Sequence, residues 1–182
     1  MALLREAGVA FETALPRVDE AAIRAALAAE GASPRDMADV LAEAKARKVA
    51  GKVGGLVVGS DQVMDLGGEA LGKVRGREAV VERLLTLAGR DHRLHSAAVA
   101  YEDGEAVWRH VSTVRLSMRS FDRDEAERIV DARWPALDGS LGYLFEAMGD
   151  LFAEVRGEEA AILGMPMRAL LPWLWLRGEV RG

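Results

Sequence analysis

Two long strand-like runs joined by a short turn restrict the folds that this chain can adopt. The runs cover residues 92–101 and 106–118, and Glu102-Asp103-Gly104-Glu105 between them has the composition of a hairpin turn. Elsewhere along the chain, strand-like and helical patterns alternate, which is typical of an α/β protein. A hairpin within such an alternation predicts a mixed β-sheet with flanking helices rather than a purely parallel sheet.

The other predicted elements follow from capping residues and glycines. Ser33-Pro34 provides an N-cap and a proline at the first helical position, and Gly51 ends that helix. Leu56-Val57-Val58 has glycines on both sides and predicts a short buried strand, and residues 65–69 contain the glycines of a tight hairpin turn. Helices are also predicted over 21–30, 76–88, 121–130 and from about Met167, and a last strand over 151–155.

Length and composition indicate a single globular domain over residues 1–182. Half of the residues are hydrophobic and 29% are charged, which predicts a packed core rather than disorder. The net charge of −5 argues against a nucleic-acid polymer as a partner, because phosphate contacts need clustered Lys and Arg. The chain has no cysteine, which excludes disulfides and thiolate chemistry and fits a cytoplasmic location.

The sequence predicts no membrane partner. No signal peptide is visible, since the chain turns charged at Arg5, and no apolar run approaches the roughly 20 residues needed to cross a bilayer. The most apolar stretch, residues 170–176, is short and contains Pro172. We expect it to form a buried terminal helix, with a membrane-surface contact or a homodimer interface as the alternatives.

Asp61 is the strongest local candidate for chemistry. It directly follows the predicted short strand, at the end where ligands of α/β sheets gather. Together with Lys45 on the preceding helix and Lys73 after Gly72, it could hold a triphosphate and a divalent cation. On spacing alone, the commoner interpretation is a turn or capping aspartate with solvated lysines.

His92 and His95 are weaker candidates. They stand three residues apart in a predicted strand, so their side chains should lie on opposite faces and are poor partners for one metal ion. The sequence also contains no Walker loop, dinucleotide-binding glycine motif or nucleophile elbow.

A series of short motifs covers nearly the whole chain in order. The motifs are Leu3-Leu4-Arg5-Glu6-Ala7-Gly8 with Phe11 and Val18-Asp19-Glu20, Leu41-Ala42-Glu43-Ala44-Lys45-Ala46, Leu56-Val57-Val58-Gly59-Ser60-Asp61-Gln62-Val63, Gly68-Glu69-Ala70-Leu71-Gly72-Lys73, Leu87-Ala88-Gly89-Arg90-Asp91-His92 and Leu163-Gly164-Met165-Pro166. In this order and spacing the chain resembles the Maf family of nucleoside triphosphate pyrophosphatases. Each motif alone is weak, whereas the series is specific.

The resemblance implies both a fold and an activity. The fold is an elongated, two-lobed, mixed-sheet α/β structure similar to that of inosine triphosphate pyrophosphatases. The activity is hydrolysis of non-standard or excess nucleoside triphosphates to monophosphate and pyrophosphate with a divalent metal cation (Mg or Mn). Its role would be housecleaning of nucleotides, and the family is also linked to inhibition of septum formation. Ser60-Asp61-Gln62 rather than Ala-Asp-Thr looks like the subgroup acting on 7-methyl-GTP rather than on dTTP and UTP.

The resemblance also assigns roles to residues by position. Asp61 would be the catalytic general base or the carboxylate that organises the metal, and Glu20 would support the metal. Lys45 and Lys73 would contact the triphosphate. Gln62 and Glu146 would complete the substrate-binding set, with Glu146 facing the base or a phosphate.

The chain departs from the family pattern at its start. Family members open with a strand and a Ser-x-Ser-x-x-Arg-Arg loop that cradles phosphate, whereas this chain starts at Met1-Ala2-Leu3-Leu4. A sheet that lacks this strand should expose an unpaired edge or rearrange. The favoured explanation is a true start upstream of Met1. The alternative is a degenerate, non-catalytic nucleotide-binding or division-linked regulatory protein. Val74 and Ala147 stand where the family favours Pro and Gly.

Overall fold

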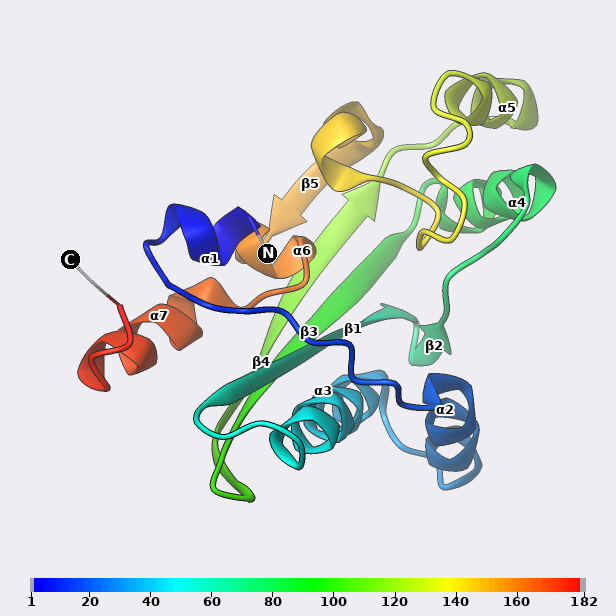
Figure 1. Ribbon diagram of the computed structural model, residues 1–182. Helices are drawn as coiled ribbons and strands as arrows, with labels where there is room; N and C mark the ends of the chain where they lie inside the picture. Colours follow the sequence, from blue (N-terminus) through cyan, green and yellow to red (C-terminus); the bar gives the residue numbers. More distant parts are fainter. Residues whose placement is uncertain (1, 181–182) are drawn as a thin grey trace.

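The structure is a computed structural model that describes residues 2–180 (Figure 1). Its helices are α1 Ala2–Glu6, α2 Glu20–Ala29, α3 Pro34–Ala50, α4 Arg77–Leu87, α5 Arg123–Asp131, α6 Glu159–Ile162 and α7 Met167–Leu176. Its strands are β1 Val57–Leu66, β2 Glu69–Leu71, β3 Asp91–Glu102, β4 Glu105–Met118 and β5 Phe152–Arg156. Two short 3-10 turns, η1 Phe145–Ala147 and η2 Gly149–Leu151, precede β5. The predicted helices, the β3–β4 hairpin and the last strand are confirmed.

The strands form one five-stranded sheet in the order β2-β1-β3-β4-β5. The predicted α/β class with a helix-flanked sheet is confirmed, but the predicted mixture of strand directions is corrected, because all four pairings are antiparallel. The short β2 explains the difference. It is only three residues long, so the chain stays near the end of β1 and β3 starts there, with Arg93 opposite Asp65.

Strand β1 is longer than the sequence predicted. It continues through Gly59 for ten residues, so Asp61 lies in the middle of a strand and not at its end. The predicted position of Asp61 is therefore corrected. The strand has a glycine at position 59 because α3 approaches it closely. A Cβ atom there would lie 2.5 Å from the Ala42 carbonyl oxygen and 2.5 Å from the Ala46 amide nitrogen. This glycine permits packing and does not mark a strand boundary.

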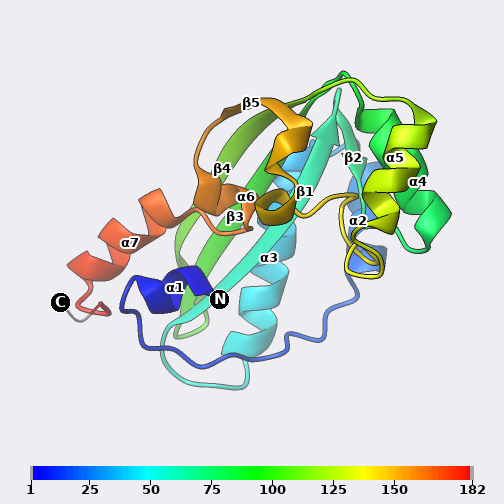
Figure 2. The same ribbon diagram turned by 90° about the horizontal axis from the view of Figure 1, so that it is seen from above.

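Helices cover both faces of the sheet (Figures 1 and 2). On one face, α3 packs against β1 and β3, with α2 beside it; the core there includes Met37, Leu41, Ala42, Ala46, Val63, Ala97 and Val99. On the other face lie α1 and α7, whose core includes Leu4, Ala98, Met165, Leu170 and Leu174. A third cluster joins α4 and α5 to the end of the sheet at which β1 finishes, through Met64, Val80, Leu84, Leu94, Leu116 and Val130.

Ser33 caps α3 as the sequence predicted, and Asp19 provides a further cap, for α2. Asp19 caps α2 by accepting a hydrogen bond from the Ala22 amide at 3.0 Å, and Ser33 caps α3 by accepting one from the Asp36 amide at 3.1 Å. Both side chains satisfy amides that have no partner within their helix. These caps fix where α2 and α3 begin, and therefore where Glu20 lies relative to α3.

The apolar C-terminal helix is buried on one side only. Leu170 and Leu174 are in the core, whereas Trp175 and Leu176 remain 66% and 89% exposed. None of the helices in residues 2–180 is long and apolar enough to cross a bilayer. The expected burial of this helix is thus confirmed for one face.

One edge of β1 has no strand partner among the described residues. Strand β2 pairs only with Met64–Leu66, so residues 57–63 are free on the side opposite β3. A hollow of about 500 Å³ runs along this part of β1. Its walls include residues 57–60 of the strand, residues 9–14 of the segment after α1, and Lys45 of α3. The unpaired edge expected from the sequence is therefore present.

Candidate functional site

Asp61 lies at the centre of a cluster of charged side chains between β1 and the helices that cover it. Its side chain is on the same face of the sheet as Val63, toward α3, and the residue is 8% exposed. Lys45 donates to Oδ1 at 2.5 Å, and Arg24 donates from Nη2 to Oδ2 at 3.1 Å. Both carboxylate oxygens of Asp61 therefore accept hydrogen bonds from cations, and such charge-assisted bonds are among the stronger ones in proteins.

Glu20 completes this cluster. The Lys45 ammonium lies 2.9 Å from Glu20 Oε1, so one lysine bridges two carboxylates that come from different elements. The structure thus brings together Asp61, Lys45 and Glu20, three of the six residues that the sequence predicted for the site. Arg24 is a fourth member that the sequence analysis missed. It follows Glu20 by one helical turn, so a helix that places Glu20 near Asp61 also places Arg24 there.

Local packing explains why Lys45 reaches Asp61. The neighbouring Ala46 faces the sheet and is fully buried, and Gly59 offers no side chain, so the backbone of α3 lies very close to β1. The ammonium of Lys45 can then meet the Asp61 carboxylate two residues farther along the strand. The site is built by this close approach of a helix to a strand, and not by a loop at a strand end.

Burial and charge act in opposite directions on the two central groups. Burial is the largest influence on Asp61 and raises the pKa of its carboxyl above the ordinary value, although Lys45 and Arg24 oppose it. Burial also disfavours the charged ammonium of Lys45, but the hydrogen bond and charge of Asp61, followed by those of Glu20, outweigh it and raise the pKa of Lys45. Lys45 is therefore charged at neutral pH, and Asp61 is a stronger proton acceptor than an exposed aspartate.

Lys73 and Glu146 lie outside this cluster. Lys73 is exposed two residues after β2, in a loop held by a hydrogen bond from the Val74 amide to the Ser140 carbonyl at 2.9 Å. Glu146 is exposed in η1, which follows the same loop region. Neither side chain makes an ion pair within residues 2–180, so the structure does not join them to Asp61.

Gln62 faces the opposite side of the sheet from Asp61, as strand alternation requires. Its amide nitrogen donates to the Ala161 and Ile162 carbonyls of α6 at 2.8 and 2.9 Å, and it lies 2.9 Å from Ser96 Oγ. These contacts hold α6 against the sheet. In this arrangement Gln62 supports packing, and its predicted contact with substrate is not visible in the geometry.

The two histidines lie on opposite faces of β3, which confirms that prediction. His92 Nε2 is 2.7 Å from the Tyr143 hydroxyl in the core near α4, and burial lowers the pKa of His92 to about 4. His95 is on the face that carries Asp61. Its Nε2 lies 3.2 Å from Asp65 Oδ2, and its Nδ1 lies 2.9 Å from Thr113 Oγ1. Both nitrogens of the His95 ring have partners, whereas His92 has a partner for Nε2 only and its buried Nδ1 has none among the described residues.

Glu20 and Asp61 are the carboxylates that fit a divalent cation. Residues 2–180 contain no group of three or more His, Asp or Glu side chains able to hold a metal by themselves. Two carboxylates supply only hard oxygen ligands, and Mg²⁺ is commonly held by one or two carboxylates together with substrate phosphates. The donor set therefore suits a cation that binds with an anionic substrate better than a permanently held one.

The hollow beside β1 gives small molecules access to this region. It has a volume of about 500 Å³. Its lining includes Lys45, which contacts Asp61, and Ser60, which precedes Asp61 in the sequence. Glu12 and Thr13 contribute polar groups from the facing segment. A cavity of this size suits a ligand of nucleotide dimensions. Lys45, the cation at its wall, could bind a phosphate, and the Asp61 carboxylate that Lys45 contacts could activate a water molecule.

Comparison with known proteins gives a consistent result. A family model described as Maf-like protein matches residues 1–175. The chain is 45% identical over 181 residues to "Nucleoside triphosphate pyrophosphatase 1" of Jannaschia sp. (strain CCS1), an alignment that covers 98% of this chain and 91% of that protein. It is also 45% identical over 180 residues to "Nucleoside triphosphate pyrophosphatase" of Caulobacter vibrioides, covering 98% and 90%. A protein of the same name from Paramagnetospirillum magneticum is 38% identical over 181 residues, covering 98% and 93%.

Proposed function

The chain belongs to the Maf family, and on that premise we propose that it hydrolyses nucleoside triphosphates to nucleoside monophosphate and pyrophosphate. The names of its relatives support the reaction, and the sequence motifs had led to the same expectation. The observation that carries the proposal is the buried Asp61 carboxylate with Lys45 at 2.5 Å, beside a cavity of about 500 Å³.

In the proposed reaction, Asp61 acts as the general base. A water molecule attacks the α-phosphorus, its proton passes to the Asp61 carboxylate, and the bond from the α-phosphorus to the bridging oxygen of the β-phosphate breaks. The electron pair of that bond leaves with pyrophosphate, and the monophosphate keeps the new oxygen. The raised pKa of Asp61 suits this role, because a general base works best when its pKa approaches the operating pH.

Lys45 and Arg24 have two proposed tasks. They hold the Asp61 carboxylate in place by contacting one oxygen each. Lys45 is in addition the cation at the cavity wall, so it is placed to contact a substrate phosphate and to offset its negative charge. Lys73 and Glu146 are proposed as more distant contacts, which requires the loops that carry them to meet the substrate.

We propose that Glu20 and Asp61 would hold a divalent cation, Mg²⁺ or Mn²⁺. Such a cation, when bound, neutralises charge on the phosphates. The Lys45 ammonium now lies between these carboxylates at 2.9 and 2.5 Å, so Lys45 would have to give up part of these contacts in the loaded enzyme. The displaced ammonium would then be free to contact phosphate.

The nucleotide base that the enzyme prefers is a separate part of the proposal. The names of the relatives specify no base, so the likeness of Ser60-Asp61-Gln62 to the 7-methyl-GTP subgroup stays a prediction. Since Gln62 contacts α6, any effect of this residue on the base would act through the position of α6. We expect the reaction to take place in the cytoplasm, in line with the lack of cysteine.

A nucleotide panel tests the proposed reaction. Pyrophosphate release is measured from 7-methyl-GTP, UTP and dTTP with Mg²⁺ or Mn²⁺, in water enriched in ¹⁸O. We expect pyrophosphate as the product, with the label in the monophosphate. Orthophosphate as the first product, or label in pyrophosphate, would exclude attack at the α-phosphorus. Calorimetric binding of these nucleotides without turnover would support the alternative of a non-catalytic nucleotide-binding protein.

A further inference from the structure

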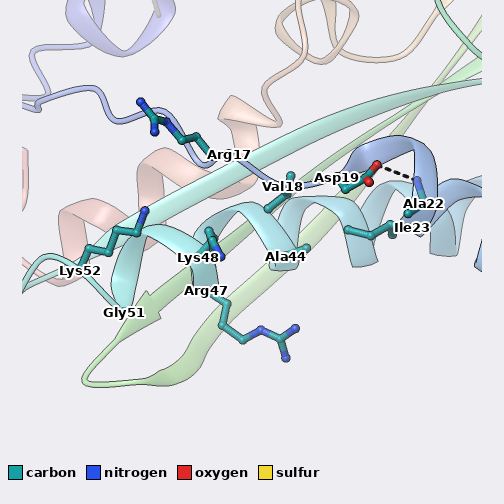
Figure 3. Close-up of a pocket in the computed structure, with 10 residues that line it drawn as sticks. All are labelled: Arg17, Val18, Asp19, Ala22, Ile23, Ala44, Arg47, Lys48, Gly51 and Lys52. Carbon is teal, nitrogen blue, oxygen red and sulfur yellow. Dashed lines mark hydrogen bonds between the residues drawn. The ribbon is translucent and has the colours of Figure 1, made fainter.

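A second hollow lies on the outer side of α3, away from the sheet (Figure 3). It has a volume of about 640 Å³ and lies between the C-terminal half of α3 and the segment that leads into α2. Lys48 of α3 and Lys52 after its end form one side, and Arg17 contributes from the facing segment. The hollow is separate from the Asp61 cluster, because Lys45 belongs to the lining of the other cavity.

The charges around this hollow are strongly unbalanced. Arg17, Arg47, Lys48 and Lys52 line it, and Asp19 is the only carboxylate among its lining residues. The Asp19 carboxylate already accepts the capping hydrogen bond from the Ala22 amide at 3.0 Å. The hollow therefore has an excess of positive charge, in a protein whose net charge is −5.

These cations also lack partners. Within residues 2–180, none of the four makes an ion pair with a carboxylate, whereas Arg77, Arg109 and Arg123 all do. Figure 3 shows the Lys52 ammonium directed toward the side on which Arg17 lies, while Arg47 extends away from both. We therefore take Arg17, Lys48 and Lys52 as the anion-facing set.

The backbone of Arg17 adds an independent observation. Its φ angle is +45°, in the left-handed region that side chains other than those of Gly, Asn and Asp rarely adopt. Arginine has no short polar group that could satisfy its own backbone there. Strained residues of this kind concentrate at ligand sites, so the conformation that places Arg17 at the hollow calls for a functional explanation.

Small residues keep the hollow open. Ala22, Ala44 and Gly51 line it, and Val18 and Ile23 add modest apolar surface. Lys48 and Lys52 are four residues apart, and Arg17 faces them from the other side of the hollow, an arrangement that matches a compact ligand with two or three linked phosphates. An extended polyanion such as a nucleic acid would also meet the negative charge of the rest of the molecule.

We propose that this hollow binds a compact polyphosphate through Arg17, Lys48 and Lys52. The ligand is either free pyrophosphate or the phosphate tail of a nucleotide, which share the same chemistry. Lys48 also lies in the last turn of α3, where a cation stabilises the helix dipole. That role does not account for Lys52 and Arg17, which lie outside the helix.

Isothermal titration calorimetry without a divalent metal tests the proposal. Pyrophosphate, orthophosphate, a nucleoside monophosphate and a triphosphate are titrated into the protein and into the variants Lys48→Gln, Lys52→Gln and Arg17→Gln. The matched control is Arg35→Gln, an exposed cation of α3 that does not line the hollow. Circular dichroism confirms that each variant is folded. The Asp61→Asn variant shows whether binding depends on the other site.

We expect pyrophosphate to bind and each of the three variants to weaken it by about tenfold, since each loses one charge-assisted contact. The control and Asp61→Asn should stay within about twofold. If pyrophosphate binds as tightly as the triphosphate, the ligand is free polyphosphate. If the triphosphate binds much more tightly and the three variants lose that binding too, the ligand is the phosphate tail of a nucleotide. The proposal is overturned if pyrophosphate does not bind, or if Arg35→Gln or Asp61→Asn weakens binding as much as Lys48→Gln does. None of these outcomes depends on turnover.

Discussion

Asp61 is held by cations from two consecutive helices. Lys45 comes from α3 and contacts Oδ1, and Arg24 comes from α2 and contacts Oδ2. Each contact limits the rotation of the carboxylate, so its orientation depends on both helices. In the proposed reaction, Asp61 accepts the proton, and Lys45 and Arg24 hold its carboxylate in position.

Replacing Arg24 by Gln should impair the reaction without unfolding the protein. Its guanidinium is the partner of Asp61 Oδ2 and also lies 3.9 Å from Met37 Sδ, so the change frees one carboxylate oxygen and keeps Lys45 in place. We expect kcat to fall by about tenfold and KM to change little, because orientation of the base is lost and phosphate binding is not. Steady-state kinetics on the best nucleotide measures this, with Arg24→Lys expected to recover part of kcat. Unchanged kcat in Arg24→Gln would show that Arg24 does not position the base.

His92 should make the folded protein less stable as the pH falls. Burial lowers the pKa of His92 to about 4, while the unfolded chain has an ordinary histidine pKa of about 6.5. Between these values the unfolded state binds a proton that the folded state does not, so stability is lost as the pH falls through 6.5 toward 4. From pH 7 to pH 5 this amounts to about 2 kcal/mol in the free energy of unfolding.

Urea denaturation at pH 7 and pH 5 measures this loss. A His92→Gln variant is less stable at both values, because it loses the fit to Tyr143, but it should lack the part of the pH dependence that comes from His92. An equal decrease from pH 7 to pH 5 in the variant and in the parent would mean that His92 is not responsible.

At the scale of elements, the contact of α3 with β1 builds the site. A side chain at Gly59 would meet the backbone of α3 at Ala42 and Ala46, at 2.5 Å. Backbone atoms cannot move aside as a flexible side chain can, so α3 must shift as a whole. Since Lys45 lies next to Ala46, a shift of the helix also moves the ammonium away from Asp61.

A Gly59→Ala change should therefore reduce stability and activity together. We expect a loss of about 2–3 kcal/mol in the free energy of unfolding, as for an overpacked core, and a clear decrease in kcat/KM. Gly149→Ala is the matched control, because nothing lies within 4 Å of a Cβ atom there and Gly149 does not line the cavity beside β1. Denaturation and kinetics on both variants test the point. If Gly59→Ala behaved like Gly149→Ala, the close approach of the helix would not be needed.

The sequence predicted elements better than it predicted their extent. The Ser33 cap predicted the start of α3 correctly, because capping depends on neighbouring residues alone. Strand β1 was predicted too short, because Gly59 resembles a local terminator and its reason for being glycine is a contact with α3, distant in sequence. The antiparallel order of the sheet likewise depends on the length of β2, which no local pattern specified.

The sequence predicted only part of the site, again because some of its contacts depend on how distant segments pack. Glu20, Lys45 and Asp61, to which the family resemblance gives roles, lie in contact in the structure. Arg24 was missed because its contact requires the orientation of α2 over β1, which only the folded structure supplies. Gln62 and Asp61 point to opposite faces of the sheet because neighbouring residues of a strand alternate. The sequence indicates this once β1 is known to extend through both residues.

At the scale of the whole molecule, α3 lies between two cavities of different character. Lys45 lines the cavity beside β1, next to the Asp61 carboxylate, and Lys48 lines the outer hollow with its excess of cations. We propose that hydrolysis takes place at the first cavity, and that the second cavity binds polyphosphate and catalyses no reaction. The binding test with Lys48→Gln and the kinetic tests at the Asp61 site can therefore fail independently.

The most direct test of the account compares pyrophosphate release by the parent and by Asp61→Asn under saturating nucleotide and metal. Asp103→Asn is the control, since this exposed aspartate lies in the β3–β4 turn, where asparagine tolerates its φ angle of +49°. We expect Asp61→Asn to lower kcat by about 100-fold or more, as for loss of a general base, and Asp103→Asn to retain the parent rate. Parent-like release of pyrophosphate by Asp61→Asn would contradict the account, because the buried carboxylate around which the site is built would then take no part in the reaction.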